Sequence, residues 1–293
     1  MRASSTHQSI QRWSGYLFLC PYLAVFAVFL ALPFFYGLGL SLVQWEMLSE
    51  TPAKFVGMQN YREALGDAYF WKALWATVRF VVMTTPLTVG AALLIALGLH
   101  AIKGRRQGLY RTLYFLPTLI SISVAGILWR WFYTSEFGLF NALLQKIGWS
   151  IPFINDPKLA MKSIVAMTLW WTVGGPVVIL LAGLHQIPRQ YYEAAEIDGA
   201  GPLAMLRHVT LPQLRPVLLF ALVMNLIGSF QVFGQTFIIT WGGPELSTRV
   251  LVQYIYETAF RNYRMGYGAA MSWLLFMVVL VLSIAQFRLM REK

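Results

Sequence analysis

The chain has 293 residues, of which 58% are apolar and only 12% are charged, and its mean hydropathy is +0.59. Soluble proteins carry about 25% charged residues, so this composition indicates a membrane protein. The net charge is +11, but the basic excess lies in short segments between apolar runs, which argues against nucleic-acid binding.

Six apolar runs are long enough to cross a bilayer, since about 20 apolar residues span its hydrocarbon core. They are Tyr16–Leu42, Ala73–His100, Leu113–Tyr133, Ser163–Leu184, Pro216–Thr240 and Gly266–Phe287. The first run exceeds the apolar region of a signal peptide, and no small-residue cleavage site follows it, so we expect an uncleaved span. The sequence therefore predicts an all-α membrane protein with six transmembrane helices.

The Lys and Arg distribution predicts the orientation of these spans. With a cytoplasmic N-terminus, the inside segments are 1–15, 101–112, 185–215 and 288–293, and the outside loops are 43–72, 134–162 and 241–265. The inside segments hold 12 Lys and Arg against 4 Asp and Glu, whereas the outside loops hold 9 against 8. We therefore expect both termini and the 185–215 loop to be cytoplasmic, in a multi-pass plasma-membrane protein.

No catalytic or metal-binding motif is recognisable in the sequence. Cys20 is the single cysteine, which excludes a disulfide framework, and no two of the four histidines lie at ligand spacing on one helix. The chain contains no phosphate-binding loop and no hydrolase motif. We therefore expect no catalytic residue, no metal and no cofactor.

The segment Gln190–Pro212 is a long polar stretch between the fourth and fifth apolar runs. Arg189–Asp198 is rich in Ala and Glu and contains no Gly or Pro, which favours a helix. We expect Gly199 and Gly201 to end this helix.

A second short helix is expected to follow, beginning at Pro202 and ending at Pro212. The first helix carries Glu193 and Glu196 on one face, whereas a helix lying on a membrane surface favours basic residues there. The segment is therefore predicted to bind a protein partner.

The spacing of this segment resembles the EAA motif of binding-protein-dependent ABC importer permeases, E-A-A-x3-G-x9-I-x-L-P. Here Glu193-Ala194-Ala195 is followed after three residues by Gly199 and after nine more by Val209-Thr210-Leu211-Pro212, with Val209 in place of Ile. Further segments resemble the sugar-type permeases, and among them the maltose-permease-like first subunit. These segments are Tyr16–Pro21, Phe55–Tyr61, Tyr110–Pro117, Arg130–Phe132 with Phe137 and Gly138, and Gly242–Pro244.

The resemblance covers nearly the whole chain and implies a type I ABC importer permease fold. It implies an N-terminal part of residues 1–72 with the first span and first external loop, a permease core of residues 73–287, and a cytoplasmic coupling loop at 185–215. By position, the residues that couple the chain to an ATPase are Glu193, Ala194, Ala195, Asp198 and Gly199.

The implied function is a permease subunit that moves a sugar or oligosaccharide by alternating access. ATP hydrolysis is then carried by a partner, so the chain itself is not expected to be an enzyme. The implied partners are a second, different permease subunit, two cytoplasmic ATP-binding subunits and an external solute-binding protein.

Polar side chains near the midplane of the fourth and fifth spans are candidates for a substrate path, because polar groups there are costly and usually face a cavity. They are Thr168, Thr172, Asn225, Ser229, Gln231 and Gln235. Uncharged hydroxyls and amides suit a neutral polyhydroxylated ligand. The alternative is that these side chains bond neighbouring helices.

A permease for glycerol-3-phosphate or another polyol is the alternative function, and it would favour cationic residues along the path. Only Arg79 and Arg130 are candidates, and long basic side chains near the ends of spans usually reach the headgroups instead. A secondary transporter is disfavoured because no acidic residue lies inside a predicted span.

Aromatic residues recur at the expected outer level of the membrane. The tryptophans there are Trp45, Trp71, Trp129, Trp131 and Trp241. They are typical of an interfacial belt, and a sugar-stacking surface is the alternative for one of them. The turn-rich segments Phe55–Tyr61 and Trp241–Pro244 are either caps on helix ends or a platform for an external protein.

Overall fold

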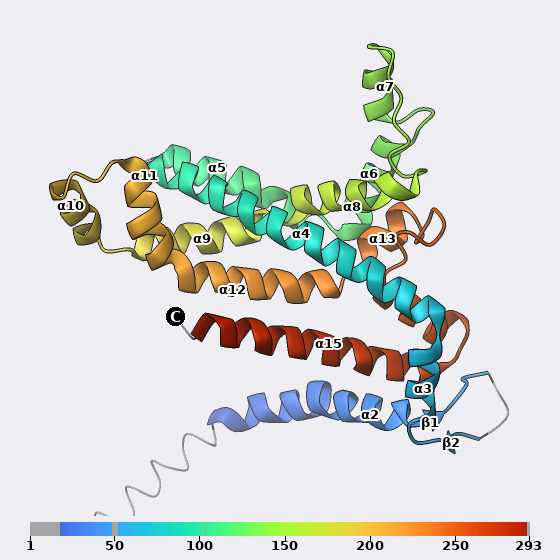
Figure 1. Ribbon diagram of the computed structural model, residues 1–293. Coiled ribbons are helices and arrows are strands. Elements are labelled where there is room, and N and C mark those ends of the chain that lie inside the picture. The colour runs from blue at the N-terminus through green and yellow to red at the C-terminus, as the bar shows by residue number, and fades with distance from the viewer. Residues whose placement is uncertain (1–17, 49–51, 103, 292–293) are drawn as a thin grey trace, which may run out of the picture. The chain divides into compact units, whose positions relative to one another are not determined.

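The computed structural model describes residues 18–48, 52–102 and 104–291 and is mostly helical (Figure 1). Three parts of the expected cytoplasmic segments lie outside the described residues. They are the segment expected to precede the first span, Lys103 in the basic 101–112 segment, and residues 292–293. The chain divides into two compact units. Unit 1 comprises residues 1–66 and 255–274, and unit 2 comprises residues 67–254 and 275–293.

Unit 1 contains the first predicted span and a short antiparallel pair of strands. Its elements are the helix Phe18–Ser41 with η1 (Ala27–Ala31) and α2 (Leu32–Ser41), β1 (Val43–Gln44), β2 (Lys54–Phe55), α3 (Gln59–Gly66), η4 (Glu257–Arg261) and the first part of α15 (Met265–Arg291). The Phe34 ring lies 4.6 Å from the Trp273 ring, so α2 packs on α15 within this unit.

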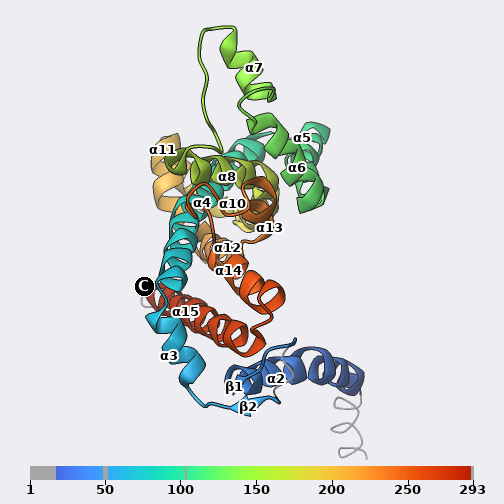
Figure 2. The ribbon, with the colours of Figure 1, turned by 90° about the vertical axis from the view of Figure 1, so that its right-hand side faces the viewer.

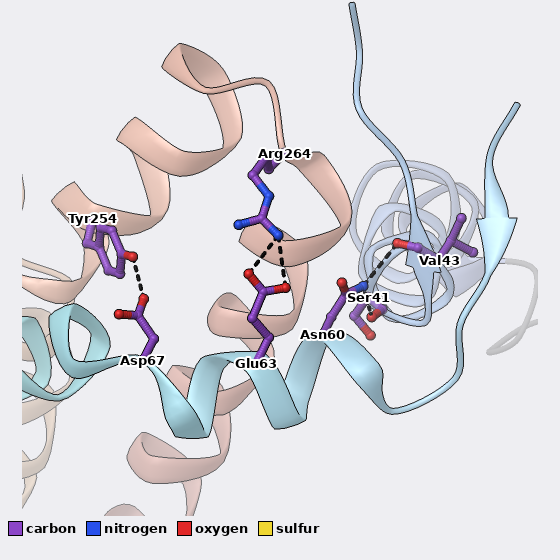
Figure 3. A network of polar contacts seen from close by, with 7 residues as sticks. All are labelled: Ser41, Val43, Asn60, Glu63, Asp67, Tyr254 and Arg264. Atoms are coloured by element: carbon purple, nitrogen blue, oxygen red, sulfur yellow. Dashed lines mark hydrogen bonds and ion pairs between the residues drawn. The ribbon is translucent and has the colours of Figure 1, made fainter. Parts of the chain in front are cut away.

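A polar network closes the turn after α2 (Figure 3). The Asn60 amide Nδ2 donates to the backbone carbonyls of Ser41 at 2.9 Å and Val43 at 3.0 Å. The last carbonyls of a helix have no partner within it, so Asn60 supplies one. Arg264 binds both carboxylate oxygens of Glu63, at 2.7 and 2.9 Å. Asn60, in the segment Phe55–Tyr61, therefore caps a helix end.

Unit 2 contains the other helices. They are α4 (Ala68–Ala101), α5 (Arg105–Phe115), η2 (Leu116–Leu119), α6 (Ile122–Tyr133), α7 (Leu139–Gln145), α8 (Pro157–Thr172), α9 (Gly174–Gln186), α10 (Arg189–Ile197), α11 (Pro202–Met205), η3 (Leu206–Thr210), α12 (Leu211–Phe230), α13 (Gly234–Ile239), the start of α14 (Leu251–Tyr256) and the second part of α15. Helices α4, α9 and α12 pack on one another, and α7 stands away from the other helices of unit 2 in both views (Figures 1 and 2).

Four helices are long and apolar enough to cross a bilayer, and two bent pairs bring the possible number of spans to six. The four are Phe18–Ser41, Ala68–Ala101, Pro202–Phe230 and Met265–Arg288. The pairs are Arg105–Leu119 with Ile122–Tyr133, bent by 92°, and Pro157–Thr172 with Gly174–Gln186, bent by 49°. The prediction of an all-α membrane protein is confirmed, and the side on which the termini lie stays a prediction.

Three of the predicted spans are not continuous helices. The third turns at Pro117, after which Ser121 caps α6 by accepting from the Val124 N–H. The fourth bends at Val173, where α8 gives way to α9. The fifth was expected to run to Thr240, but α12 ends at Phe230 and α13 begins at Gly234.

The prediction that Pro212 ends a short helix is wrong, because Pro212 lies in the first turn of α12. The π-helical segment Leu206–Thr210 explains the difference, because the Leu211 N–H reaches back five residues to the Leu206 carbonyl. Pro212, which has no N–H, follows this widened turn, so the helix continues from Pro202 to Phe230.

The bend at Val173 depends on a close backbone contact. A Cβ atom at Gly174 would lie 2.4 Å from the Tyr114 carbonyl oxygen and 2.7 Å from the Phe115 Cα atom, both of which are backbone. A Cβ atom at the neighbouring Gly175 would meet nothing within 4 Å. These adjacent glycines therefore provide a matched test of the packing.

We predict that Gly174→Ala destabilises the protein by about 1–3 kcal/mol, because the backbone around Tyr114 cannot yield as a side chain would. Gly175→Ala is expected to leave stability unchanged or slightly higher, since Ala favours a helix. Thermal unfolding of the two variants, purified in the same detergent, measures the difference. Equal melting temperatures would show that α9 does not depend on this contact.

Candidate functional site

The structure brings five of the six candidate path residues together around one cavity of about 220 Å³ in unit 2. These five are Thr168, Thr172, Asn225, Ser229 and Gln235. The other lining residues are Phe80, Thr84, Trp171, Met224, Gly228 and Val232. Gln231 is not among the lining residues and is exposed in the break between α12 and α13.

The hydrogen bonds of the lining residues show which polar groups are already engaged. The hydroxyls of Thr168 and Thr172 each donate to the backbone carbonyl four residues earlier, at 2.8 Å. The Ser229 hydroxyl donates to Asn225 Oδ1 at 3.4 Å and accepts from the Thr85 hydroxyl at 3.4 Å. The Asn225 Nδ2 donates to no described residue, so this amide is the group best placed to meet a ligand.

Thr84 is a lining residue that the sequence analysis missed. It is 1% exposed, and its hydroxyl has no hydrogen-bond partner among the described residues. A buried hydroxyl without a partner is costly, and a ligand hydroxyl in the cavity would relieve that cost. The signal for this residue is the group Thr84, Thr85 and Thr88 within the otherwise apolar second run.

The lining residues carry no charge, and two of them, Phe80 and Trp171, are aromatic. Neither Arg79 nor Arg130 lines the cavity. Arg79 Nη2 donates to the Ser247 carbonyl at 3.0 Å, and Arg130 is exposed. The arrangement therefore offers hydroxyls, amides and aromatic rings, which suit a neutral polyhydroxylated molecule.

The five candidate coupling residues lie on α10 and in the turn that ends it. Asp198 is the C-cap residue, and Gly199 follows with φ +77°. The Gly199 N–H donates to the Glu196 carbonyl at 3.0 Å, and the Ala200 N–H donates to the Ala195 carbonyl at 2.9 Å. These two bonds form a Schellman motif, so Gly199 ends the helix as predicted. Gly201 has φ −72° and does not share this role.

Helix α10 is fastened to the helix that follows it. The Tyr192 hydroxyl lies 3.1 Å from the Thr210 hydroxyl in η3, and Thr210 is 6% exposed. The continuous helix Pro202–Phe230 carries Asn225 and Ser229 to the cavity. On the other side α10 follows α9, and α8 carries Thr168 and Thr172 (Figure 1). Two routes therefore connect α10 with the cavity: α8 and α9 before it, and the helix Pro202–Phe230 after it.

Helices α10 and α11 and the turn between them also expose large apolar side chains. Tyr191 is 49% exposed, Ile197 is 88% exposed and Leu203 is 77% exposed. Glu193 is also exposed and pairs with Arg189 at 3.2 Å, a surface ion pair that contributes little to stability. Large apolar side chains this exposed favour contact with a partner over contact with water.

The expected tryptophan belt is only partly supported. Trp129 is half-buried and packs against the rings of Tyr133, Phe140 and Trp170 beside the core, which gives it a structural role as well. Trp71, Trp131 and Trp241 are about half exposed, at 50%, 45% and 51%.

Comparison with known proteins identifies one family across almost the entire chain. Residues 10–291 match the family described as binding-protein-dependent transport system inner membrane component. A probable ABC transporter permease of Bacillus subtilis is 36% identical over 93% of this chain and 94% of its own. The lactose transport system permease of Rhizobium radiobacter is 34% identical over 99% of both chains. The sn-glycerol-3-phosphate transport system permease of Agrobacterium fabrum is 31% identical over 95% and 94%.

The fold also matches solved structures. A chain of a bacterial ABC transporter involved in the import of alginate, an acidic polysaccharide, superimposes with a TM-score of 0.81. It is 23% identical and covers 98% of each chain, so the likeness establishes the fold.

We predict that Gly199→Ala weakens the turn after α10, because a left-handed conformation costs a residue with a Cβ atom about 1–2 kcal/mol. Amide hydrogen exchange at residues 190–200 should become at least about fivefold faster. Gly199→Asn should have a smaller effect, since Asn tolerates this conformation better. Gly201→Ala is the control, and an equal increase in this variant would contradict the assignment of the turn.

Proposed function

Because this chain belongs to the family of binding-protein-dependent transport system inner membrane components, we propose that it is the permease subunit that carries a neutral sugar or oligosaccharide through an ABC importer. The observation that carries this proposal is the cavity lined by threonine, serine, asparagine and glutamine side chains together with Phe80 and Trp171. The similarity to a lactose permease across the whole chain supports the same substrate class.

Transport of glycerol-3-phosphate or another polyol is the second candidate, and one relative of that class is 31% identical to this chain. A phosphate ester carries negative charge and is best held by Arg or Lys. The cavity residues carry no charge, and Arg79, one turn of α4 before Met83 and Thr84, is engaged with the Ser247 carbonyl. The cavity therefore favours the neutral substrate.

The cavity is also small for a sugar. Ligand sites commonly enclose about 300–1,000 Å³, whereas this one measures about 220 Å³. We propose that a second, different permease subunit supplies the remainder of the path. Two cytoplasmic ATP-binding subunits and an external solute-binding protein would complete the importer.

The proposed mechanism uses the helices that join α10 to the cavity. When the ATP-binding subunits close, they move α10, and the Schellman turn and the Tyr192–Thr210 contact transmit this motion to the helix Pro202–Phe230. Tilting that helix against α8 moves Asn225 and Ser229 relative to Thr168 and Thr172. The cavity would thereby open alternately to the two sides of the membrane. The coupling is reciprocal, so loading from outside also favours closure of the ATP-binding subunits.

The orientation of the chain is part of the proposal. Within unit 2, α10 lies at the opposite end of the helices from α7 and α13 (Figure 1). The excess of Lys and Arg on the α10 side favours the cytoplasm for that end and the external side for α7 and α13.

Glu193→Lys is predicted to lower ATP-driven sugar uptake by at least about tenfold, because it replaces a carboxylate on the docking surface by a cation. Uptake is measured in proteoliposomes that contain the complete importer and its binding protein. Glu136→Lys, the same reversal at an exposed glutamate before α7, is the control and should transport normally. Full uptake by the Glu193 variant would refute the coupling assignment.

Asn225→Ala is predicted to change the order of preference among a panel of neutral sugars. It should also lower uptake of the preferred sugar about tenfold, since a lost hydrogen bond between the amide and a sugar hydroxyl costs about 1–1.5 kcal/mol. Asn155→Ala, at an exposed amide before α8, serves as the control. The complexes should assemble equally, as judged by size-exclusion chromatography. An unchanged preference and rate in the Asn225 variant would remove this residue from the path.

A further inference from the structure

The short helix α7 and the turn after it expose a row of apolar side chains. Leu139 and Leu143 lie four residues apart in α7 and therefore share a face, and Ile147 and Trp149 follow in the turn. Leu143, Ile147 and Trp149 are 54%, 67% and 64% exposed. We infer that α7 and this turn form an interfacial anchor, whose exposed row enters the bilayer surface at the end of unit 2 that we assign to the external side.

The other side of α7 is held firmly by the protein. The Phe140 ring packs on the Tyr133 ring, with centroids 5.5 Å apart. Asn141 is fully buried, and its Nδ2 donates to the Ile151 carbonyl while its Oδ1 accepts from the Ile151 N–H, both at 2.8 Å. These contacts fix the rotation of α7, so the exposure of Leu143 is a built feature and not the result of loose packing.

The direction of α7 fits a helix that lies along a membrane surface. In Figure 1 the helices α4, α9 and α12 run lengthwise through unit 2, whereas α7 lies across their direction at the end away from α10. It extends away from the other helices in Figure 2 as well. With seven residues, α7 is roughly 10 Å long, far shorter than the hydrocarbon core of about 30 Å. It therefore cannot cross the bilayer and is placed at its surface.

The exposed row continues the exposed apolar surface of α6. Val124, Ile127 and Trp131 of α6 are exposed at helical spacing, and Phe137, which is also exposed, lies between α6 and α7. Helix α6 belongs to a bent pair that is apolar enough to form one span. Lipid is as apolar as these side chains and surrounds such a span. The lipid that covers α6 can therefore extend onto α7.

The charge of this segment favours a bilayer over a protein as the partner. Lys146 is the single charged residue between residues 137 and 151, and it is exposed. At a bilayer surface its ammonium group can reach a lipid phosphate while its stem stays among apolar groups, and Trp149 is of the type enriched there. A permanent protein interface would bury this cation at a high cost. A solute-binding protein, which binds and leaves, would return the apolar row to water each time.

Nitroxide labels test the anchor in the complete importer, reconstituted in liposomes. Cys20, the single cysteine, is replaced by serine, and Leu143→Cys, Ile147→Cys and Gln145→Cys are labelled one at a time. Gln145 is the matched control, since it is exposed and lies two residues from Leu143, on the opposite side of α7. Power-saturation EPR measures access to O₂, which concentrates in the acyl chains, and to nickel(II) ethylenediaminediacetate, which stays in water. The ratio of oxygen to nickel access should be at least about threefold higher at positions 143 and 147 than at 145, because an interfacial helix buries one face about 5–10 Å deep.

Three other outcomes would overturn the inference. High nickel access at both positions would place the row in water. Low access to both reagents would place it against a protein, which is the second permease subunit if the shielding is already present without the binding protein. Shielding that begins only when the binding protein is added would identify that protein as the partner. Assembly is judged by size-exclusion chromatography, so the result does not depend on which substrate the importer carries.

Discussion

Inside a bilayer every backbone N–H and C=O group must find a partner within the protein, and this constraint governs where the helices of this chain can break. At the first break the Trp171 indole Nε1 donates to the Ile120 carbonyl at 2.9 Å. At the break between α12 and α13 the Gly228 carbonyl accepts from the Gln231 N–H at 3.2 Å, and the Ser229 carbonyl accepts from the Val232 N–H at 3.3 Å. Because these carbonyls are satisfied, the chain can depart from a helix there, and the cavity lies between the segments that result.

The two sites of the chain are connected because they share these broken helices. The bend at Val173 separates α8, which carries Thr168 and Thr172, from α9, which leads directly to α10. The helices α8 and α9 form the first connection. The second is the helix Pro202–Phe230, which is hydrogen-bonded to α10 through Tyr192 and ends beside the cavity. In the mechanism proposed above, a displacement of α10 would therefore act on two walls of the cavity.

Polar residues outside the cavity have structural roles. Asn60 caps the end of α2, and Thr77 Oγ1 accepts from the Leu251 N–H at 2.8 Å. Arg79 is held by a backbone carbonyl. These three polar residues thus bond other segments of the protein. The sequence predicted such bonding as the alternative for the six path candidates. Such bonding applies only in part to the cavity, where the Thr84 hydroxyl remains without a partner among the described residues.

The sequence by itself determined the membrane class, the approximate positions of the six apolar runs and the turn at Gly199, because length, hydrophobicity and a left-handed glycine are local properties. It also identified five lining residues, since helical spacing places Thr168 with Thr172 and Asn225 with Ser229. Only the tertiary structure decided that Gln231 lies outside the cavity, that Thr84 joins it from α4, and that Trp129 packs against the core. The physical reason is that the bends and the break redirect the side chains that follow them. Where a helix bends depends on contacts between segments distant in the sequence, such as that of Gly174 with Tyr114.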